Sequence, residues 1–221
     1  MNENDPSGGA DRGPPPNLPA PAGQGPTPEP SALDAVRAHV NATVSPWVLR
    51  CAPLIPGGEV LDLACGLGRH SRHLAALGHA VLAVDRDPAA LAATCGPAIT
   101  TSQIDLEADG VAWPFGGERF AGIVVTNYLH RPLIAAMLAS LAPNGMLIYE
   151  TFAAGNAAFG KPSNPAFLLQ AGELLDWARQ HGLRVIAYEE GVVTVPKTAM
   201  VQRICAVKPA FAREAARLPP F

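Results

Sequence analysis

Three carboxylates and two glycines in the first half of the chain have the types and spacing of a nucleoside-binding site. Asp62 lies just before Gly66 and Gly68 in the stretch Asp-Leu-Ala-Cys-Gly-Leu-Gly, while Asp85 and Asp105 end the next two apolar runs. Glycines let the backbone turn sharply and approach a ligand closely. An acid that ends the second strand can accept both hydroxyls of a ribose, and Asp105 could meet an adenine amino group. These residues predict a cofactor that contains adenosine.

Two cofactor classes fit that prediction, a dinucleotide and a sulfonium compound. The third glycine of the dinucleotide fingerprint would fall at Ser71, where it is absent. The carboxylate of Asp62 would repel a pyrophosphate, but it suits a cationic sulfonium or an ammonium group. The sequence favours the sulfonium donor, and a nicotinamide-dependent oxidoreductase remains the alternative.

A sulfonium donor carries an already activated methyl group, so the protein must mainly align the acceptor with it. Tyr128 and His130 follow the predicted fourth strand, and Glu150 ends the fifth. We predict these three as catalytic residues, although a general base is needed only if the acceptor is protonated. Tyr128 and His130 either orient the acceptor or only pack and cap the next helix. Glu150 either acts as a base or pairs with Arg131.

Strands and helices alternate from residue 59 onward. Apolar runs predict strands at 59–64, 80–85, 99–105, 122–127, 145–152, 183–189 and 199–207, with helices at 69–77, 88–95, 132–141 and 172–181. This order predicts an α/β, Rossmann-like doubly wound sheet. Because no helix separates the last two strands, they should form an antiparallel hairpin at one edge.

The chain divides into three predicted parts. Residues 1–30 are rich in Pro and Gly and lack large apolar side chains, which predicts a disordered tail. Residues 31–208 should form a single domain that begins with a helix at Ser31, and 209–221 a C-terminal tail. The long connection 153–170 is either a lid, with Phe159, Lys161 and Asn164 selecting the acceptor, or a solvated loop.

The composition narrows the function classes. The 221 residues carry a net charge of −3, which does not favour nucleic acid or an anionic membrane as partner. The N-terminus has no secretory signal and no apolar run spans a bilayer, so we expect a cytoplasmic protein. The four cysteines form no C-x-x-C pair. His70 and His73 share a helix but lack a third ligand, so no metal is predicted.

The segment from Val60 to about Val207 resembles the class I S-adenosylmethionine-dependent methyltransferases. The stretch 60–68 resembles the family's first motif, Asp85 its ribose-binding acid, and Asp105 with Leu106 its adenine-contacting pair. The resemblance implies S-adenosylmethionine as cofactor and the strand order 3-2-1-4-5-7-6 with strand 7 antiparallel. The implied cofactor-binding residues are Asp62, Ala64, Cys65, Gly66, Gly68, Asp85, Arg86, Asp105, Leu106 and Asn127.

Two positions depart from the family pattern. Ala64 stands where a glycine is common, and Ala121 where many members carry an aspartate. The C-terminal part resembles the small tellurite-resistance-type methyltransferases. We therefore expect transfer of a methyl group to a small-molecule acceptor, or, as the alternative, a non-catalytic regulator that binds S-adenosylmethionine.

Overall fold

A computed structural model of the chain describes residues 43–195 and 197–218. The predicted tail of residues 1–30 and nearly all of the helix predicted from Ser31 lie outside the described residues. The first described element is α2 (Pro46–Cys51), where the Ser45 hydroxyl accepts a hydrogen bond from the Trp47 backbone N–H at 3.1 Å. This capping contact and the proline in the first turn explain why the helix begins there.

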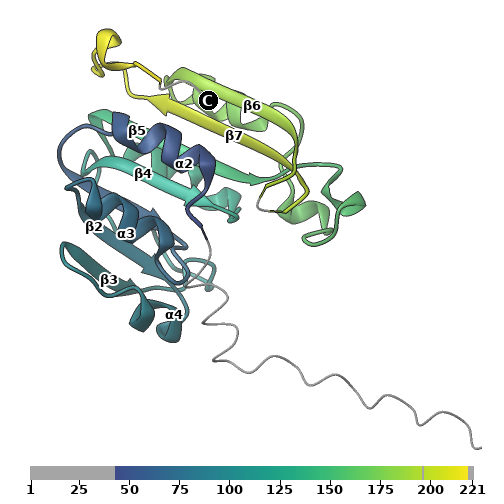
Figure 1. Cartoon of the computed structure of the whole chain (residues 1–221), viewed down its shortest axis with the longest axis horizontal. Coiled ribbons are helices and arrows are strands. Elements are labelled where there is room, and N and C mark those ends of the chain that lie inside the picture. Colours follow the sequence, from purple (N-terminus) through teal and green to yellow (C-terminus); the bar gives the residue numbers. More distant parts are fainter. Residues whose placement is uncertain (1–42, 196, 219–221) are drawn as a thin grey trace, which may run out of the picture.

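The centre of the molecule is one seven-stranded sheet with the order β3-β2-β1-β4-β5-β7-β6 (Figure 1). Its strands are β1 (Glu59–Leu63), β2 (Ala80–Asp85), β3 (Ile99–Gln103), β4 (Phe120–Thr126), β5 (Leu141–Phe152), β6 (Arg184–Val193) and β7 (Ala199–Val207). β7 runs antiparallel to both β5 and β6, and the other neighbours pair in parallel. The predicted fold class, strand order and terminal hairpin are confirmed.

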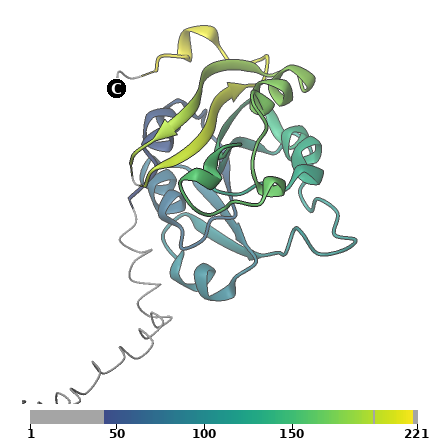
Figure 2. The same cartoon turned by 90° about the vertical axis from the view of Figure 1, so that its right-hand side faces the viewer.

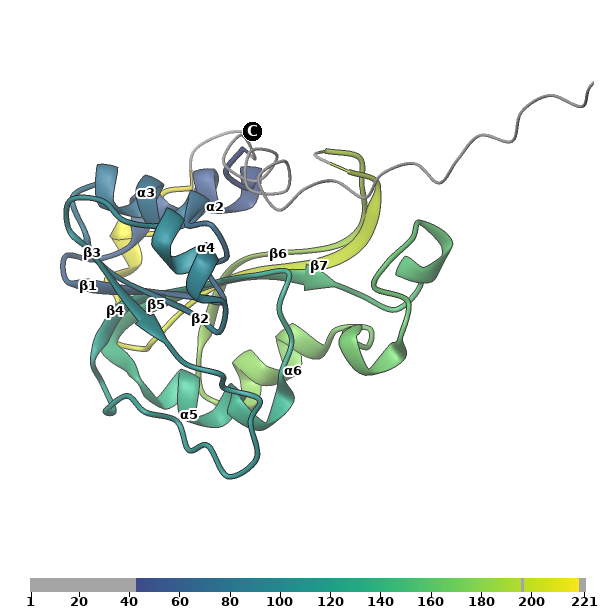
Figure 3. The ribbon, with the colours of Figure 1, turned by 90° about the horizontal axis from the view of Figure 1, so that it is seen from below.

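Helices cover both faces of this sheet. The remaining α-helices are α3 (Arg69–Ala76), α4 (Pro88–Ala93), α5 (Ile134–Ala139) and α6 (Glu173–Gln180). Figure 3 shows α2, α3 and α4 on one face and α5 and α6 on the other. Successive strand residues point to opposite faces, as Val60 packs toward α2 and α3 while Leu61 packs toward α5 and α6. Burial on both faces explains the near-continuous apolar strands.

The end of the predicted helix 132–141 is wrong. A 3-10 turn, η2 (Arg131–Leu133), precedes α5, and Leu141 already pairs with Phe120 as the first residue of β5. The register then jumps to Gly122 opposite Met146, so residues 142–145 bulge from the strand. A Cβ at position 145 would lie 2.8 Å from the Phe120 carbonyl oxygen, so the bulge requires glycine there.

Two further segments extend from the sheet. The connection between β3 and β4 projects from the body of the molecule in Figure 2. Beyond β7, Phe211 is buried, and Arg184 Nη2 donates to its carbonyl at 2.9 Å. Ordered packing thus continues past the predicted domain end at residue 208. Among the described residues, no helix has the length and apolar character needed to cross a bilayer.

Candidate cofactor and acceptor site

The loop after β1 owes its shape to left-handed backbone conformations at three positions. Ala64, Gly66 and Gly68 have φ values of 54°, 54° and 71°. A Cβ on Gly68 would lie 2.3 Å from the Thr94 side chain, whereas a Cβ on Gly66 would meet nothing within 4 Å. Gly68 is therefore needed for packing against the end of α4. Gly66 faces open space that a ligand can fill. Ala64 holds a conformation that is unfavourable without glycine.

Asp85 ties the end of β2 to this loop. Its Oδ2 accepts a hydrogen bond from the Gly66 N–H at 2.8 Å, and its Oδ1 accepts one from the Asp87 N–H at 3.0 Å. An ionised carboxylate has about four acceptor sites, so two remain for further donors. Asp85 is thus held rigidly and can still accept a pair of hydroxyl groups.

Two cavities of about 190 Å³ each adjoin at the carboxyl ends of β1, β2 and β4. They share Ala64 and Tyr128. The first is lined by Ala64, Val84, Asp85, Arg86, Ile104, Asp105, Leu106, Glu107 and Tyr128. The second is lined by Ala64, Cys65, Gly66, Leu67, Arg69, His70, Thr126, Asn127 and Tyr128. Eight predicted cofactor-binding residues are in these lists, and Asp62 and Gly68 are not.

Asp62 lies behind the loop instead of facing either cavity. It is 1 % exposed and accepts a hydrogen bond from the Ser71 hydroxyl at 2.5 Å. Burial raises the pKa of Asp62 to about 6, although the bonds from Ser71 oppose this rise. Ser71, the position of the missing third glycine, thus positions the Asp62 carboxylate at the start of α3.

His70 lines the second cavity, although the sequence analysis considered it only as a metal ligand. Its Nε2 accepts a hydrogen bond from the Ser45 N–H at 3.2 Å, and its Nδ1 lies 3.3 Å from Thr126 Oγ1. Since Nε2 is an acceptor, the proton of the neutral ring is on Nδ1. Burial, with Arg69 and His73 nearby, lowers the pKa of His70 to about 3. His70 is therefore a neutral connector between α2, β4 and the second cavity.

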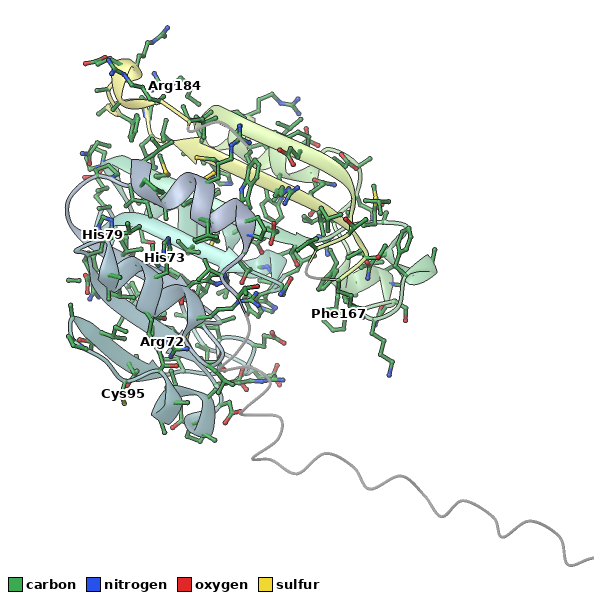
Figure 4. The ribbon with its side chains drawn as sticks, in the orientation of Figure 1. Arg72, His73, His79, Cys95, Phe167 and Arg184 are labelled. Carbon is green, nitrogen blue, oxygen red and sulfur yellow. The ribbon has the colours of Figure 1, made fainter. Side chains whose placement is uncertain are left out.

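The sequence analysis also missed the side chains that brace the loop. Arg72 Nη1 donates to the Leu67 carbonyl at 2.8 Å and to the Ala93 carbonyl at 3.2 Å (Arg72 is labelled in Figure 4). The Thr94 hydroxyl lies 3.1 Å from the Gly66 carbonyl oxygen and 2.9 Å from that of Ala90. Arg72 follows the glycine loop by four positions, but its carbonyl partners depend on how α3 packs against α4.

The strand-four loop brings Asn127 and Tyr128 to the cavities. Asn127 has a φ of 57°, and its N–H donates to the Glu150 carbonyl at 2.9 Å. The buried Tyr149 hydroxyl donates to the Tyr128 carbonyl at 2.7 Å, which fixes the loop to β5. Burial, together with the charge of Glu107, raises the pKa of Tyr128, so its phenol stays protonated. Tyr128 lines both cavities described above.

A third cavity, of about 270 Å³, continues from the first two. It shares Glu107 and Tyr128 with the first, and Asn127 and Tyr128 with the second. Its lining is Glu107, Asn127, Tyr128, Leu129, Thr151, Phe152, Pro162 and Phe167. Phe167, labelled in Figure 4, comes from the connection between β5 and α6. The arrangement provides room for a second small molecule beside the first.

Two predicted catalytic residues line none of these three cavities. His130 precedes η2, and its side chain makes no capping hydrogen bond there. Glu150 accepts from the Ser45 hydroxyl at 2.9 Å and from Arg203 Nη1 at 3.3 Å. The predicted pair of Glu150 with Arg131 is wrong, because Arg131 Nε donates to Glu173 at 2.7 Å. The pairing of β5 with β7 places Arg203 beside Glu150, and the packing of α6 places Glu173 beside Arg131.

The connection 153–170 is anchored at both ends of its course. Ala153 forms a β-bridge with Leu169, and the buried Asn156 donates from Nδ2 to the Pro162 carbonyl at 2.9 Å. Asn156 Oδ1 also accepts from the Met200 N–H at 3.1 Å. Phe159, Lys161 and Asn164 are exposed and line none of the three cavities. Phe167, which the sequence analysis did not single out, lines the third.

Trp113 packs in the core instead of covering the first cavity. Its ring meets Phe115 edge-on with centroids 5.1 Å apart, and both side chains pack against the core cluster on the α5 and α6 face.

Within residues 43–195 and 197–218, no group of three or more His, Cys, Asp or Glu side chains could hold a metal ion.

A family model matches the part of the chain that lines the first two cavities. Residues 60–145 match the family model described as a methyltransferase domain. No curated protein sequence matches the chain.

Solved structures share the fold. TehB from Haemophilus influenzae has 20% identity and a TM-score of 0.63, covering 78% of this chain and 65% of that one. A TehB-like SAM-dependent methyltransferase from Corynebacterium glutamicum has 21% identity and a TM-score of 0.55, covering 77% and 91%. A putative S-adenosylmethionine-dependent methyltransferase from Listeria monocytogenes has 16% identity and a TM-score of 0.57, covering 73% and 97%. The alignment thus spans 65%, slightly less than two thirds, of the H. influenzae chain. Residues 60–145 therefore match a methyltransferase domain, and the seven-stranded sheet has the fold of the solved S-adenosylmethionine-dependent methyltransferases.

Proposed function

We propose that this protein transfers a methyl group from S-adenosylmethionine to a small-molecule acceptor. One observation carries the proposal: the two cavities beside the glycine loop adjoin a third, and Tyr128 lines all three. A protein that only binds the cofactor has no need for the third cavity beside the two that would hold the cofactor. Two adjoining sites are what alignment of a donor with an acceptor requires.

The residues of the first two cavities suit the parts of S-adenosylmethionine. Asp85 would accept the ribose hydroxyls, while Asp105 and Leu106 would contact the adenine, with Arg86 beside them. The loop of Cys65 and Gly66, with Asn127 opposite, would hold the methionine part. Burial raises the pKa of the Cys65 thiol, which keeps the thiol uncharged. Cys65 would therefore contribute to the loop as a small side chain.

Asp62 and Gly68 would shape this site without lining it. Asp62 holds Ser71 at the start of α3, and Gly68 lets the loop pack against Thr94. Both keep the backbone of the loop in the conformation that leaves the space beside Gly66 open.

The chemistry requires little beyond placement. S-Adenosylmethionine supplies an activated methyl group, so the protein must hold the acceptor in line with it and exclude water. Tyr128 keeps its proton and would therefore act as a hydrogen-bond donor that orients the acceptor. Neither Glu150 nor His130 reaches the cavities, so we assign no step to either.

Two measurements test the proposal. Thermal denaturation with S-adenosylmethionine, S-adenosylhomocysteine and NAD should show stabilisation by the first two and none by NAD. Labelled methyl transfer to pooled small molecules should then be detected, and it should be lost in Tyr128→Ala protein that still binds S-adenosylhomocysteine. Stabilisation by NAD instead would support the oxidoreductase alternative. Cofactor binding with no transfer to any pool would support the non-catalytic regulator.

A further inference from the structure

We propose that the acceptor is a small apolar amine, and that Glu107 and Phe167 select it in the third cavity. The inference rests on the proposed function, because it assigns the acceptor to the cavity that adjoins the cofactor site. Three properties of that cavity support it: its size, its apolar wall and the sign of its charge.

The size and the wall indicate a small molecule with an apolar body. About 270 Å³ is below the range of sites for drug-sized ligands. Four of the eight lining residues are apolar: Leu129, Phe152, Pro162 and Phe167. Phe167 is 50 % exposed although it is a large apolar side chain, so it has surface to cover with a ligand.

Hydrogen bonds from Arg131 fix the backbone on both sides of Phe167. Arg131 donates from Nη1 to the Ala166 carbonyl at 2.8 Å and from Nη2 to the Leu168 carbonyl at 2.9 Å. The same guanidinium makes two hydrogen bonds to Glu173, at 2.7 and 2.9 Å. The residues on both sides of Phe167 are therefore attached to η2 and α6, which keeps this wall of the cavity in place.

The charge of the cavity indicates a cationic group. Among the described residues that line this cavity, Glu107 is the single carboxylic acid, and none is a lysine, an arginine or a histidine. Asp85 and Asp105 add negative charge in the first cavity, beside Arg86, and Arg69 lines the second cavity, which Glu107 does not line. Lys161, which the sequence suggested as a contact for an anion, is exposed and outside the lining. An ammonium group would be attracted here, while a carboxylate or an oxyanion would be repelled.

The transfer itself balances for an amine. The ammonium first gives one proton to solvent, to which Glu107 in the cavity lining is exposed. The nitrogen lone pair then forms the N–C bond while the C–S bond breaks and its electron pair goes to sulfur. The products are S-adenosylhomocysteine and an N-methylated ammonium.

The test compares two ligands that share a ring and differ in charge. The full chain, with and without S-adenosylhomocysteine, is titrated by calorimetry with 2-phenylethylamine, 3-phenylpropionate and sodium tellurite. The amine should bind about tenfold more tightly than the carboxylate, because the sign of its interaction with Glu107 is reversed. Tellurite should show no binding. Glu107→Gln should abolish the preference, whereas the exposed Glu214→Gln, which removes the same charge elsewhere, should keep it.

The apolar wall has its own variant and control. Phe167→Ala should weaken binding of both phenyl ligands by about tenfold, because the ring loses its contact surface. Phe159→Ala, in the same connection but outside the cavity lining, should leave both affinities unchanged. Equal or tighter binding of the carboxylate or tellurite overturns the proposal, as does a lack of amine binding. Failure to bind S-adenosylhomocysteine would instead refute the proposed function, and the preference for the amine would still be measured without it.

Discussion

The buried carboxylate of Asp62 makes a quantitative prediction about stability. Asp62→Asn keeps the shape of the side chain and leaves an oxygen that can accept the Ser71 hydroxyl. What it removes is the cost of burying a negative charge behind the cofactor loop. We therefore expect the variant to be more stable than the natural protein at neutral pH, although a hydrogen bond to an ionised group is replaced by a weaker one.

The magnitude follows from the pKa of the group. Burial raises it from 3.8 to about 6, and each pKa unit corresponds to about 1.4 kcal/mol. The ionised carboxylate thus destabilises the fold by about 3 kcal/mol above pH 6. The weaker bond to Ser71 offsets part of this gain, about 1 kcal/mol. A net stabilisation of about 2 kcal/mol is expected at pH 7.5.

The sign of the pH dependence is opposite to that of most carboxylates. Because the folded pKa exceeds the unfolded one, the folded state binds more protons between pH 3.8 and about 6. The contribution of Asp62 is therefore favourable below pH 3.8 and is lost as the pH rises to 6. His70 acts in the other direction: its lowered pKa makes it destabilising as the pH falls below 6.5. The contribution of His70 is the same in both proteins, so it cancels when the free energy of unfolding of the natural protein is subtracted from that of the variant. The difference reports Asp62 alone.

Urea denaturation from pH 4 to pH 7.5 measures this difference. The free energy of unfolding of Asp62→Asn minus that of the natural protein should rise by about 2–3 kcal/mol over this range. Asp109→Asn, at an exposed loop position, is the matched control and should give a flat difference. A flat difference for Asp62→Asn, or a decrease with pH, would refute the argument that burial dominates the environment of this carboxylate.

Three further predictions concern the loop and its supports. Asp85→Ala should weaken binding of S-adenosylhomocysteine at least tenfold by calorimetry, since two hydroxyl contacts are lost; unchanged affinity would exclude the ribose contact. Gly68→Ala should lower the free energy of unfolding by about 2 kcal/mol more than Gly66→Ala, because only its Cβ meets other atoms; equal effects in urea denaturation would contradict this packing. Tyr149→Phe should cost about 1–2 kcal/mol of stability, because it leaves the carbonyl of the strand-four loop without its hydroxyl donor; a neutral effect would show that the contact has no structural role.

The architecture could be predicted from the sequence because it depends on signals that are local in the chain. The strands β2 and β7 have the predicted bounds, and the Asp87 side chain accepts from the Ala89 N–H where the predicted helix from residue 88 begins. The alternation of strands and helices selects a doubly wound sheet, and the spacing from Gly66 to Asp85 places both at the same edge. The start of β5 and the end of β6 were each misplaced by four residues. At β5 the error arises because Leu141 continues the apolar pattern of α5 into the strand.

The partners of the polar side chains depended on the tertiary structure. Asp62 was expected to face the cofactor, yet the direction of its side chain from β1 places it against Ser71 of α3. Glu150 contacts Arg203 because β5 and β7 are antiparallel and pair these two residues. Neither contact leaves a local signal, since it depends on strand register and on which face a side chain occupies.

The sequence by itself therefore determined the fold class and the position of the glycine loop, through hydrophobic periodicity and short glycine spacing. Only the tertiary structure decided which residues surround the third cavity. Glu107, Tyr128 and Phe167 come from three separate connections, after β3, β4 and β5. They meet because parallel strands bring the connections after their carboxyl ends to one edge of the sheet.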